Sequence, residues 1–371
     1  MGQIQNISLK NFRNFQSCKL SFNANFNILY GLNGSGKTNI LEAISLLGKG
    51  RGFRNANLPS LSYKDSKTFI INSEYKYNSN LYDLKVYSEV KEEKYKKCIS
   101  VNNESSKDAE NFIYTSISFL FFLPEMERLF LASPNYRRNF IDKLIFSENK
   151  NYNKLINKYK INLIERSKVL QSSNYDSSWI DTIEKQISNL AIEIYNARNK
   201  QYEILNHHIK MIDNKKNYPF VISLKNIDKY EYEYGNEILF QKLLKENRAF
   251  DQKFGGSKIG PHKSDFIATI NDKVSASDLS TGQQKTLVLM LLIAQCSYLI
   301  NSKKTKPILL FDEICSHLDE TNRNLLLDFS NQFDIQLFLT GTEKSMFSFI
   351  STNANLYNIT DIWIQITHLT Q

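Results

Sequence analysis

An eight-residue stretch, Gly31 to Thr38, constrains the fold more than any other part of this chain: it reads Gly-Leu-Asn-Gly-Ser-Gly-Lys-Thr. This is the Walker A pattern, in which glycines let backbone N–H groups point at phosphate oxygens. An apolar run (26–30) precedes the stretch and a helix-like run (39–47) follows it. This is the strand, loop and helix order that a phosphate-binding loop requires. The sequence therefore predicts an α/β fold that binds a nucleoside triphosphate.

Two side chains of this loop have specific expected roles. Lys37 would reach the β- and γ-phosphates, and the Thr38 hydroxyl would bind Mg²⁺. The positive N-terminal end of the following helix would also attract the phosphates. The nucleotide contacts predicted from the loop are Gly31, Leu32, Asn33, Gly34, Ser35, Gly36, Lys37 and Thr38.

Length and composition favour a soluble protein of two lobes, or of one large domain with an insertion. At 371 residues the chain exceeds one average domain. No apolar run approaches the roughly 18 residues that a membrane helix needs, and the N-terminus lacks the pattern of a signal peptide. The cysteines lie far apart, without metal-ligand spacing: Cys18, Cys98, Cys296 and Cys315. We therefore expect reduced thiols, a cytoplasmic location and no membrane contact.

The chain carries a formal net charge of +9 at pH 7. A basic balance favours an anionic partner such as nucleic acid. Lysine, asparagine, isoleucine and tyrosine are all abundant, as expected from AT-rich codons, so part of the excess lysine would lie on solvated faces. Charge alone therefore leaves nucleic-acid binding open.

Apolar periodicity gives a coarse map of the elements. It predicts antiparallel hairpins over 68–101, a buried strand over 116–123, and helices over 134–172 and from 178 to about 211. Further strands are expected over 219–224, 265–270, 306–312 and 335–340, and helices over 236–248 and 284–300. The helix from 178 has apolar residues at spacings of three and four: Ile180, Ile183, Ile187, Leu190 and Ile194. This short seam favours a helix pair packed on a lobe over a free coiled coil.

A second nucleotide motif lies about 270 residues after the loop. Residues 308–313 read Ile-Leu-Leu-Phe-Asp-Glu, a buried strand that ends in two acids, as in a Walker B motif. Asp312 would hold Mg²⁺ through water, and Glu313 would orient and activate the attacking water. Glu313 and Lys37 are therefore the predicted catalytic residues.

Residues 279–284, Leu-Ser-Thr-Gly-Gln-Gln, resemble the signature of the ABC ATPase superfamily. Ser280, Gly282, Gln283 and the N–H groups of the helix start would contact a γ-phosphate. The alternative is an ordinary capped surface helix. Residues 316–319 follow at the place of a D-loop. In this superfamily the signature of one head completes the site of another, so one loop and one signature imply a head-to-tail homodimer that holds two ATP molecules.

Two features distinguish branches of the superfamily. Transporter ATPases have a histidine at the end of the strand after the D-loop, whereas this strand ends Thr340-Gly341-Thr342. The N-terminal turn, with Asn11, Arg13 and Asn14, is similar to that of SMC-type DNA-repair ATPases, in which it lies beside the nucleotide. Only about 240 residues separate the loop from the signature, which leaves room for a short helical arm.

Together these motifs resemble the RecF family of recombination-repair ATPases over essentially the whole chain. Further supporting segments are 48–54, 123–125, Pro134 to Asp142, Gly260 to Asp265 and Thr340 to Thr342. Two residues depart from the usual family pattern. Ala132 stands where a glycine is common, and Glu313 stands where many members have aspartate. The second departure would favour hydrolysis, because glutamate is the usual base in the superfamily.

The resemblance implies an ABC/SMC-type P-loop ATPase head with mixed sheets and helices, together with a helical second lobe. The expected boundaries are 1–130 for the first part of the head, 131–250 for the lobe and 251–371 for the rest of the head. ATP and Mg²⁺ are the implied cofactors. Glu313 and Lys37 would then support weak, slow, DNA-stimulated ATP hydrolysis.

The resemblance also implies a function in DNA repair. Such proteins dimerise with ATP on gapped DNA at single-strand/duplex junctions and act with RecR and RecO to load RecA, in repair, replication and the SOS response. Clustered basic residues would contribute to the DNA groove: Arg137, Arg138, Lys154, Lys158, Lys160, Arg166 and Lys168. Arg137 and Arg138 lie inside a family motif, so a structural role or a place close to the nucleotide is an equal alternative for them. His262 and Lys263 would lie near the ATP-dimer interface.

Three alternatives stay open at this point. The first is an ATP-gated DNA clamp that hardly hydrolyses, and turnover under saturating DNA would separate it from the main interpretation. The second is a transporter ATPase subunit, which the missing histidine disfavours. The third is an overcoming-lysogenisation-type nuclease, disfavoured because no C-terminal acidic metal cluster of the kind such nucleases use follows the Walker B motif.

Overall fold

The computed structural model describes residues 2–22, 25–64, 66–172, 176–216, 222–227, 236–313, 320–350 and 354–361. The chain groups into two compact units, one of Met1–Glu127 with Lys285–Gln371 and one of Arg128–Gln284. The predicted lobes have other boundaries, since residues 251–284 group with the second unit. The reason is that strand β10 (Asp265–Ile270) pairs with strand β9 (Ile222–Ile227) of that unit. The division into functional domains stays a prediction.

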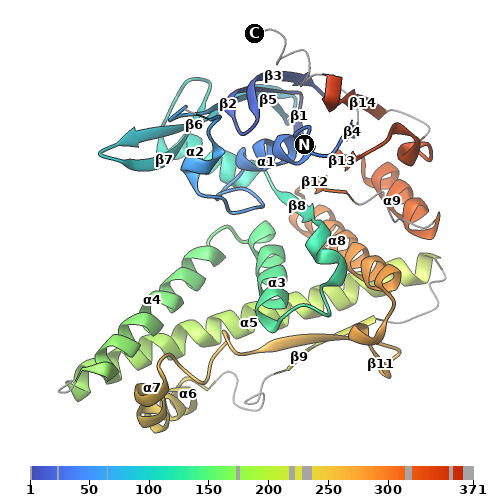
Figure 1. Ribbon diagram of the computed structural model, residues 1–371. Helices are drawn as coiled ribbons and strands as arrows, with labels where there is room; N and C mark the ends of the chain where they lie inside the picture. The colour runs from blue at the N-terminus through green and yellow to red at the C-terminus, as the bar shows by residue number, and fades with distance from the viewer. Residues whose placement is uncertain are drawn as a thin grey trace. The chain divides into compact units, whose positions relative to one another are not determined.

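A parallel sheet forms the centre of the first unit (Figure 1). Its described strands run in the order β14 (Ala354–Asn358), β4 (Phe26–Tyr30), β13 (Leu337–Gly341), β12 (Ile308–Phe311) and β8 (Phe119–Phe122). Every neighbouring pair is parallel, so the strands' carboxyl ends meet at one edge. Strands β12 and β13 are buried throughout, as expected for a parallel sheet covered on both faces. The buried strands predicted over 116–123, 306–312 and 335–340 are confirmed.

An antiparallel sheet makes up the rest of the described strands of this unit. Its order is β3 (Phe15–Ser21), β2 (Asn6–Phe12), β5 (Ile70–Tyr77), β6 (Asn80–Lys91) and β7 (Lys94–Val101), and β1 (Gln3–Ile4) pairs with β5. The hairpins predicted over 68–101 are confirmed. Their two-residue turns, Asn78-Ser79 and Glu92-Glu93, all have positive φ, as the tight turns of twisted hairpins require. The second turn was not anticipated, because glutamate is a rare turn residue.

The helices of the first unit are α1 (Lys37–Leu46), α2 (Lys107–Ser116), most of α8 (Thr281–Lys303) and α9 (Glu320–Phe333), with short 3₁₀ helices at Leu58–Leu61, Pro124–Arg128 and Lys344–Phe347. Helix α8 begins one turn before the predicted start at residue 284. By length and composition it could cross a membrane, with a mean hydropathy of 1.3, so the prediction that no apolar run approaches that length is wrong. Because 83% of that window is buried inside the protein, α8 has the character of a core helix.

The second unit is mainly helical (Figure 1). It contains α3 (Pro134–Glu148), α4 (Tyr152–Gln171), α5 (Ser177–Lys216), α6 (Glu237–Glu246) and α7 (Arg248–Phe254), and a small sheet in which β10 lies between β9 and β11 (Val274–Ser275). The predicted apolar seam of α5 packs in one core cluster with residues of α4 and α6, which confirms the packed helix pair. Its members include Tyr159, Ile183, Ile187, Ile194 and Phe240.

Among the described residues, Cys18, Cys98 and Cys296 are free thiols, as predicted. Cys315 and the predicted D-loop (316–319) lie outside the described residues.

Candidate nucleotide site

The predicted phosphate loop joins β4 to α1 at the carboxyl edge of the parallel sheet. Gly36 has a φ of 105° and precedes the first helical residue. A Cβ at Gly36 would lie 2.5 Å from Cζ of Phe15 and 2.6 Å from Nδ2 of Asn14. Only glycine fits here, because the backbone is left-handed and another chain segment packs directly on the loop. The strand, loop and helix arrangement predicted from residues 31–38 is therefore present.

Lys37 lies buried inside the loop. Its Nζ donates to the carbonyl oxygens of Gly31 (2.7 Å) and Leu32 (2.9 Å). Burial lowers the pKa of this amine, while the charges of Glu313 and Asp312 oppose that shift. The ammonium is therefore held at the loop together with the two acids that the sequence predicts as metal holder and base.

Ser35 gives an independent indication that the loop is built for an anion. Its side chain is buried, and its Oγ has no hydrogen-bond partner in the part of the chain that the structure describes. A buried hydroxyl without a partner is unfavourable unless a ligand supplies one. At the loop apex, Leu32 is 69% exposed, and a Cβ built at Gly34 would meet nothing within 4 Å. Asn33 is exposed as well. The apex therefore leaves room for phosphate oxygens.

The predicted metal holders lie in direct contact. Thr38 Oγ1 donates to Asp312 Oδ1 over 3.0 Å. Burial raises the pKa of Asp312, and hydrogen bonds from Thr340 and Thr38 oppose the shift. Because Thr38 gives its proton to the carboxylate, the lone pairs of its oxygen stay available for a cation. Oxygen donors of this kind suit Mg²⁺, which takes few protein ligands and several from phosphate and water. No group of three or more His, Cys, Asp or Glu that could hold a metal occurs among the described residues.

Glu313 follows directly after Asp312 with an exposed side chain and a φ of 53°. Its backbone N–H donates to Thr340 Oγ1 over 2.8 Å, and the same hydroxyl donates to Asp312 Oδ1 over 2.7 Å. Thr340 was not predicted as a site residue; the sequence showed it only as part of a family motif. Thr340 lies near the end of β13, the strand that pairs with both motif strands, β4 and β12. A single sequence does not reveal that strand order.

The N-terminal turn contacts the loop through one of its three predicted residues. Asn14 Nδ2 donates to the carbonyl of Ser35 (3.1 Å), and its Oδ1 accepts from Asn39 (2.8 Å). Arg13 instead makes a two-pronged ion pair with Glu42 of α1, at 2.7 and 2.8 Å, and also donates to the carbonyl of Ser60. Asn14 is therefore placed to shape the loop, whereas Arg13 fixes the helix behind it.

Asn11, the third residue of that turn, has a φ of 53°, and its carbonyl accepts from the N–H of Tyr63. Asn11 therefore contributes to the backbone conformation of the N-terminal turn. Its predicted contact with the nucleotide stays a prediction, as does that of Arg13.

The signature residues form the start of α8. Ser280 Oγ accepts from the N–H of Gln283 (3.3 Å), and Gln283 Oε1 accepts from the N–H of Ser280 (3.0 Å). This reciprocal pair is a capping box. Ser280, Gly282 and Gln283 are all exposed. They belong to the second unit, so the geometry described above for the first unit does not include them. The cap of that alternative is present, but α8 is a core helix rather than a surface helix, and the predicted phosphate contacts stay predictions.

Two family motifs of the second unit, residues 134–142 and residues 260–265, are joined by ion pairs and hydrogen bonds. Arg137 makes a two-pronged ion pair with Asp265 (2.8 and 2.5 Å), and Arg138 donates to the carbonyl of Ser264 (2.6 Å). Arg198 pairs with Asp142 and donates to the carbonyl of Pro261. The prediction that Arg137 and Arg138 contact DNA is not supported, because these guanidinium groups already bind partners within the unit.

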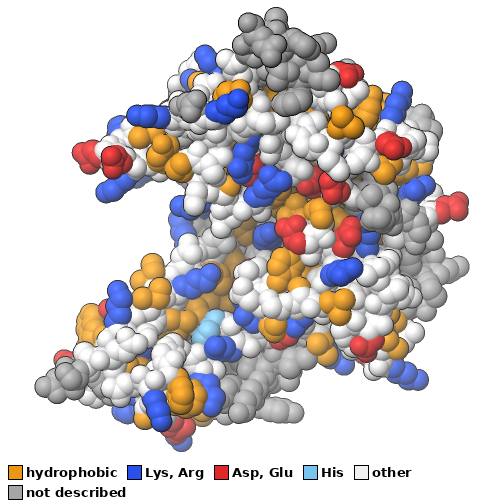
Figure 2. Space-filling view, in the orientation of Figure 1, with side chains coloured by type: hydrophobic (Ala, Val, Ile, Leu, Met, Phe, Trp, Pro, Cys, Tyr) orange, Lys and Arg blue, Asp and Glu red, His pale blue; other side chains and the backbone are white. Residues whose placement is uncertain are grey.

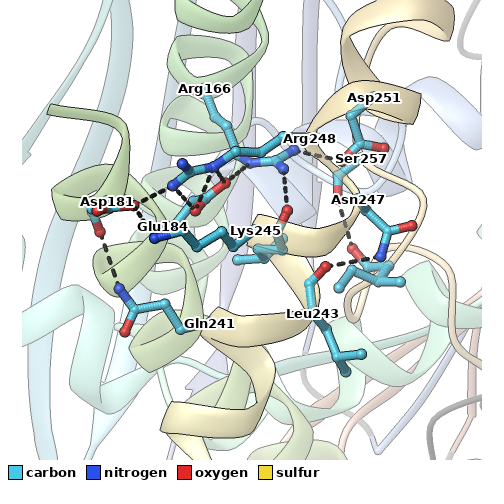
Figure 3. Close-up of polar contacts among 12 residues, drawn as sticks. Arg166, Asp181, Glu184, Gln241, Leu243, Lys245, Asn247, Arg248, Asp251 and Ser257 are labelled. Carbon is cyan, nitrogen blue, oxygen red and sulfur yellow. Dashed lines mark hydrogen bonds and ion pairs between the residues drawn. The ribbon is translucent and has the colours of Figure 1, made fainter. Parts of the chain in front are cut away.

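Arg166 lies in a buried ion network (Figure 3). It is 1% exposed and donates to Glu184 (2.9 Å), to Asp251 (2.6 Å) and to the carbonyl of Leu244 (2.8 Å). Arg248 binds the same Glu184 and also Asp181. The prediction that Arg166 contributes to a DNA groove is wrong, since its charge is enclosed between α4, α5 and α7.

His262 is held by both ring nitrogens. Its Nε2 lies 2.9 Å from the carbonyl oxygen of Ser257, which can only accept, so Nε2 carries the proton. Its Nδ1 therefore accepts from the hydroxyl of Tyr159, 2.8 Å away. Burial lowers the pKa of His262 to about 4. The imidazole is neutral at physiological pH, and its predicted place near a dimer interface stays a prediction.

Comparison with known proteins identifies similar sequences over almost the whole chain. The model of the family described as "RecF/RecN/SMC N terminal domain" matches residues 3–364. A protein of Rickettsia massiliae named "DNA replication and repair protein RecF" is 31% identical over 361 residues, covering 96% of this chain and 99% of its own length. A protein of the same name from Rickettsia bellii is 31% identical over 345 residues, covering 92% of this chain and 94% of its own.

Solved structures agree with these matches. The structure entitled "recombination mediator protein RecF-ATPrS in RecFOR pathway" has a TM-score of 0.82 at 25% identity and covers 97% of each chain. The RecF-ATP structure of the same pathway has a TM-score of 0.80 at 24% identity and covers 97% of this chain and 96% of its own. An Smc head bound to ScpA has a TM-score of 0.53 at 16% identity, with 93% and 92% covered, a likeness of fold alone. The predicted ABC/SMC-type ATPase fold is confirmed.

Proposed function

The chain belongs to the RecF family of DNA replication and repair proteins, and on this basis we propose that it is an ATP-dependent DNA-binding protein that dimerises on gapped DNA. The observation that carries the proposal is the contact of Thr38 with Asp312 at 3.0 Å. It joins the loop to the strand that bears both acids. A family ATPase fold with this contact supports ATP binding and hydrolysis in general.

For hydrolysis, each residue has a role that follows from its position. The glycine-rich backbone and Lys37 would bind the phosphates, and Thr38 and Asp312 would hold Mg²⁺, which neutralises phosphate charge and orients the transferred group. Glu313 would orient the attacking water as general base. Ser35 would hydrogen-bond a phosphate oxygen. The family's slow, DNA-stimulated turnover is proposed here on resemblance.

Dimerisation is proposed from the signature. Ser280, Gly282 and Gln283 are exposed at a helix N-terminus, whose N–H groups suit an anion. A second copy would bring this helix end to the γ-phosphate, so two copies would enclose two ATP molecules head to tail. Because the chain has one loop and one signature, each copy would need the other.

DNA binding is supported by charge. The formal net charge is +9, and Lys154, Lys158, Lys160 and Lys168 of α4 are exposed. Figure 2 shows Lys and Arg side chains on the surface over α4. Lysine–phosphate contacts give affinity that falls with salt and that is independent of sequence. The preference for single-strand/duplex junctions, the partners RecR and RecO, RecA loading, the SOS response and the cytoplasmic location are proposed on family resemblance.

The test is the DNA affinity of Glu313→Gln by fluorescence anisotropy on gapped duplex, with and without ATP at fixed salt. This substitution should trap the ATP-bound state by blocking water activation. We expect tighter binding with ATP and loss of that gain when Lys37→Met is added. An affinity that ignores ATP would contradict the proposal. Turnover of the unsubstituted protein under saturating DNA then separates a slow ATPase from a clamp that does not hydrolyse.

A further inference from the structure

Strand β13 lies between the strands that carry the two nucleotide motifs. It pairs with β4, which leads into the phosphate loop, and with β12, which leads into Asp312. All three run parallel, so their carboxyl ends lie side by side at one edge of the sheet. Thr340, near the end of β13, is completely buried. Its side chain is therefore placed between the two halves of the nucleotide site.

The hydroxyl of Thr340 makes two bonds whose directions are fixed. A backbone N–H can only donate, so Oγ1 accepts from the N–H of Glu313 at 2.8 Å. The one proton of the hydroxyl is then free to be donated to Asp312 Oδ1, 2.7 Å away. One side-chain atom thus bonds both residues of the Asp-Glu pair.

Each of these bonds fixes a different part of the site. The bond to Oδ1 aims the carboxylate of Asp312 at Thr38, whose hydroxyl donates to the same oxygen. The bond from Glu313 holds its N–H while the backbone has a φ of 53°, a conformation that residues other than glycine seldom adopt. Without this bond, the direction in which the Glu313 side chain leaves the chain would be less defined.

The neighbouring Gly341 limits which side chains fit at the end of β13. A Cβ at Gly341 would lie 2.7 Å from Cε2 and Cζ of Phe347, so a histidine at this position would require Phe347 to move. The carbonyl of Gly341 also accepts from the N–H of Gly31, 3.3 Å away, which ties the strand end to the phosphate loop. The end of β13 therefore serves the site through its backbone and through Thr340.

We propose that Thr340 is a positioning residue for ATP hydrolysis, which orients the metal-holding Asp312 and the water-orienting Glu313 through one hydroxyl. The inference rests on the proposed ATPase function. Thr340 would not touch the nucleotide; it would set the geometry of two groups that do. Loss of its hydroxyl would then weaken Mg²⁺-dependent steps and leave Mg²⁺-independent nucleotide binding intact.

The test compares Thr340→Val, which keeps the shape but lacks the hydroxyl, with Thr340→Ser, which restores it. Thr342→Val is a matched control, because that hydroxyl, two residues further on, bonds only to the sulfur of Met346 among the contacts described. Three quantities are measured on the full chain: affinity for a fluorescent ATP analogue in EDTA, the Mg²⁺ concentration that half-saturates the gain in that affinity, and kcat with KM for ATP.

For Thr340→Val we expect affinity in EDTA within about twofold of the unsubstituted protein, since phosphate binding by the loop is untouched. Its half-saturating Mg²⁺ concentration should rise about tenfold or more, and kcat should fall by a similar factor with little change in KM, as for residues that orient a metal ligand. Thr340→Ser and Thr342→Val should stay close to the unsubstituted protein in all three.

Two results would overturn the inference: an unchanged Mg²⁺ requirement in folded Thr340→Val, or an equal loss in Thr340→Val and Thr340→Ser. If Thr340→Val does not fold, Thr340→Cys, a weaker donor, takes its place with the same expected direction. The Mg²⁺ measurement needs no turnover, so it decides the role of Thr340 even if the chain hydrolyses nothing. Absence of any ATP binding by the unsubstituted protein would refute the proposed function itself.

Discussion

Removal of the Arg166 side chain should destabilise the helical unit without weakening DNA binding by the folded protein. Arg166 is 1% exposed, and its partners Glu184 and Asp251 are 0% and 1% exposed. In Arg166→Ala, Glu184 keeps its pair with Arg248, but the Asp251 carboxylate keeps only the backbone N–H of Lys258 among its described hydrogen-bond partners. Breaking a buried ion pair in this way costs about 3–5 kcal/mol.

The assay is calorimetric unfolding of the full chain together with the salt dependence of DNA affinity. For a unit of about 150–250 residues, each kcal/mol lowers Tm by about 2–4 °C, so the helical-unit transition of Arg166→Ala should fall by about 6–20 °C. Below that transition, the slope of log affinity against log salt should not change, because a buried guanidinium releases no counterion.

The matched control is Lys154→Ala, which removes an exposed cation from the same helix, α4. It should change stability by no more than about 0.5 kcal/mol. If Lys154 contacts a phosphate, the salt slope should fall by about 1. An unchanged Tm for Arg166→Ala, together with a reduced slope of log DNA affinity against log salt, would refute the buried structural role of Arg166. If that variant does not fold at all, Arg166→Lys should show a smaller decrease in Tm, also with no change in slope.

Two further predictions concern His262 and the loop glycines. The pKa of His262 in the folded protein is about 4, below its ordinary value of 6.5. Between these two pH values the unfolded state therefore binds more protons than the folded state. The contribution of His262 to stability thus decreases as the pH falls from 6.5 to 4. Urea unfolding measures the free energy of unfolding at pH 7 and at pH 4. Between these two values it should fall by up to about 3 kcal/mol more in the unsubstituted protein than in His262→Gln, and equal decreases would contradict the neutral ring. Gly36→Ala should weaken ATP binding more than tenfold, because its Cβ would meet Phe15 and Asn14. Gly34→Ala, also left-handed with a φ of 84° but without a neighbour within 4 Å, should have a smaller effect in the same titration.

Most of the elements could be predicted because their signals are local. The apolar run before residue 31 and the run into Asp312 are buried strands, and the period of α5 matches its packed face. The start of α8 was misplaced by one turn because Ser280 and Gln283 cap it from within the signature. The assignment of Arg166 to a DNA groove is wrong and that of Arg137 is unsupported, for a common reason. Neither the ion pair of Arg137 with Asp265 nor that of Arg166 with Asp251 can be inferred from the charge of the arginine alone.

The sequence by itself determined which residues could bind phosphate and metal, because strand, loop and helix in one continuous segment form the phosphate loop through local backbone geometry. The tertiary structure alone decided which distant residues complete that site. Thr340 lies between the loop strand and the Asp312 strand only because β13 is the middle strand of the three. Arg13 fixes α1 only because the turn folds over Glu42. Strand order and long-range partners depend on how the whole chain packs, and no spacing within a single sequence specifies them.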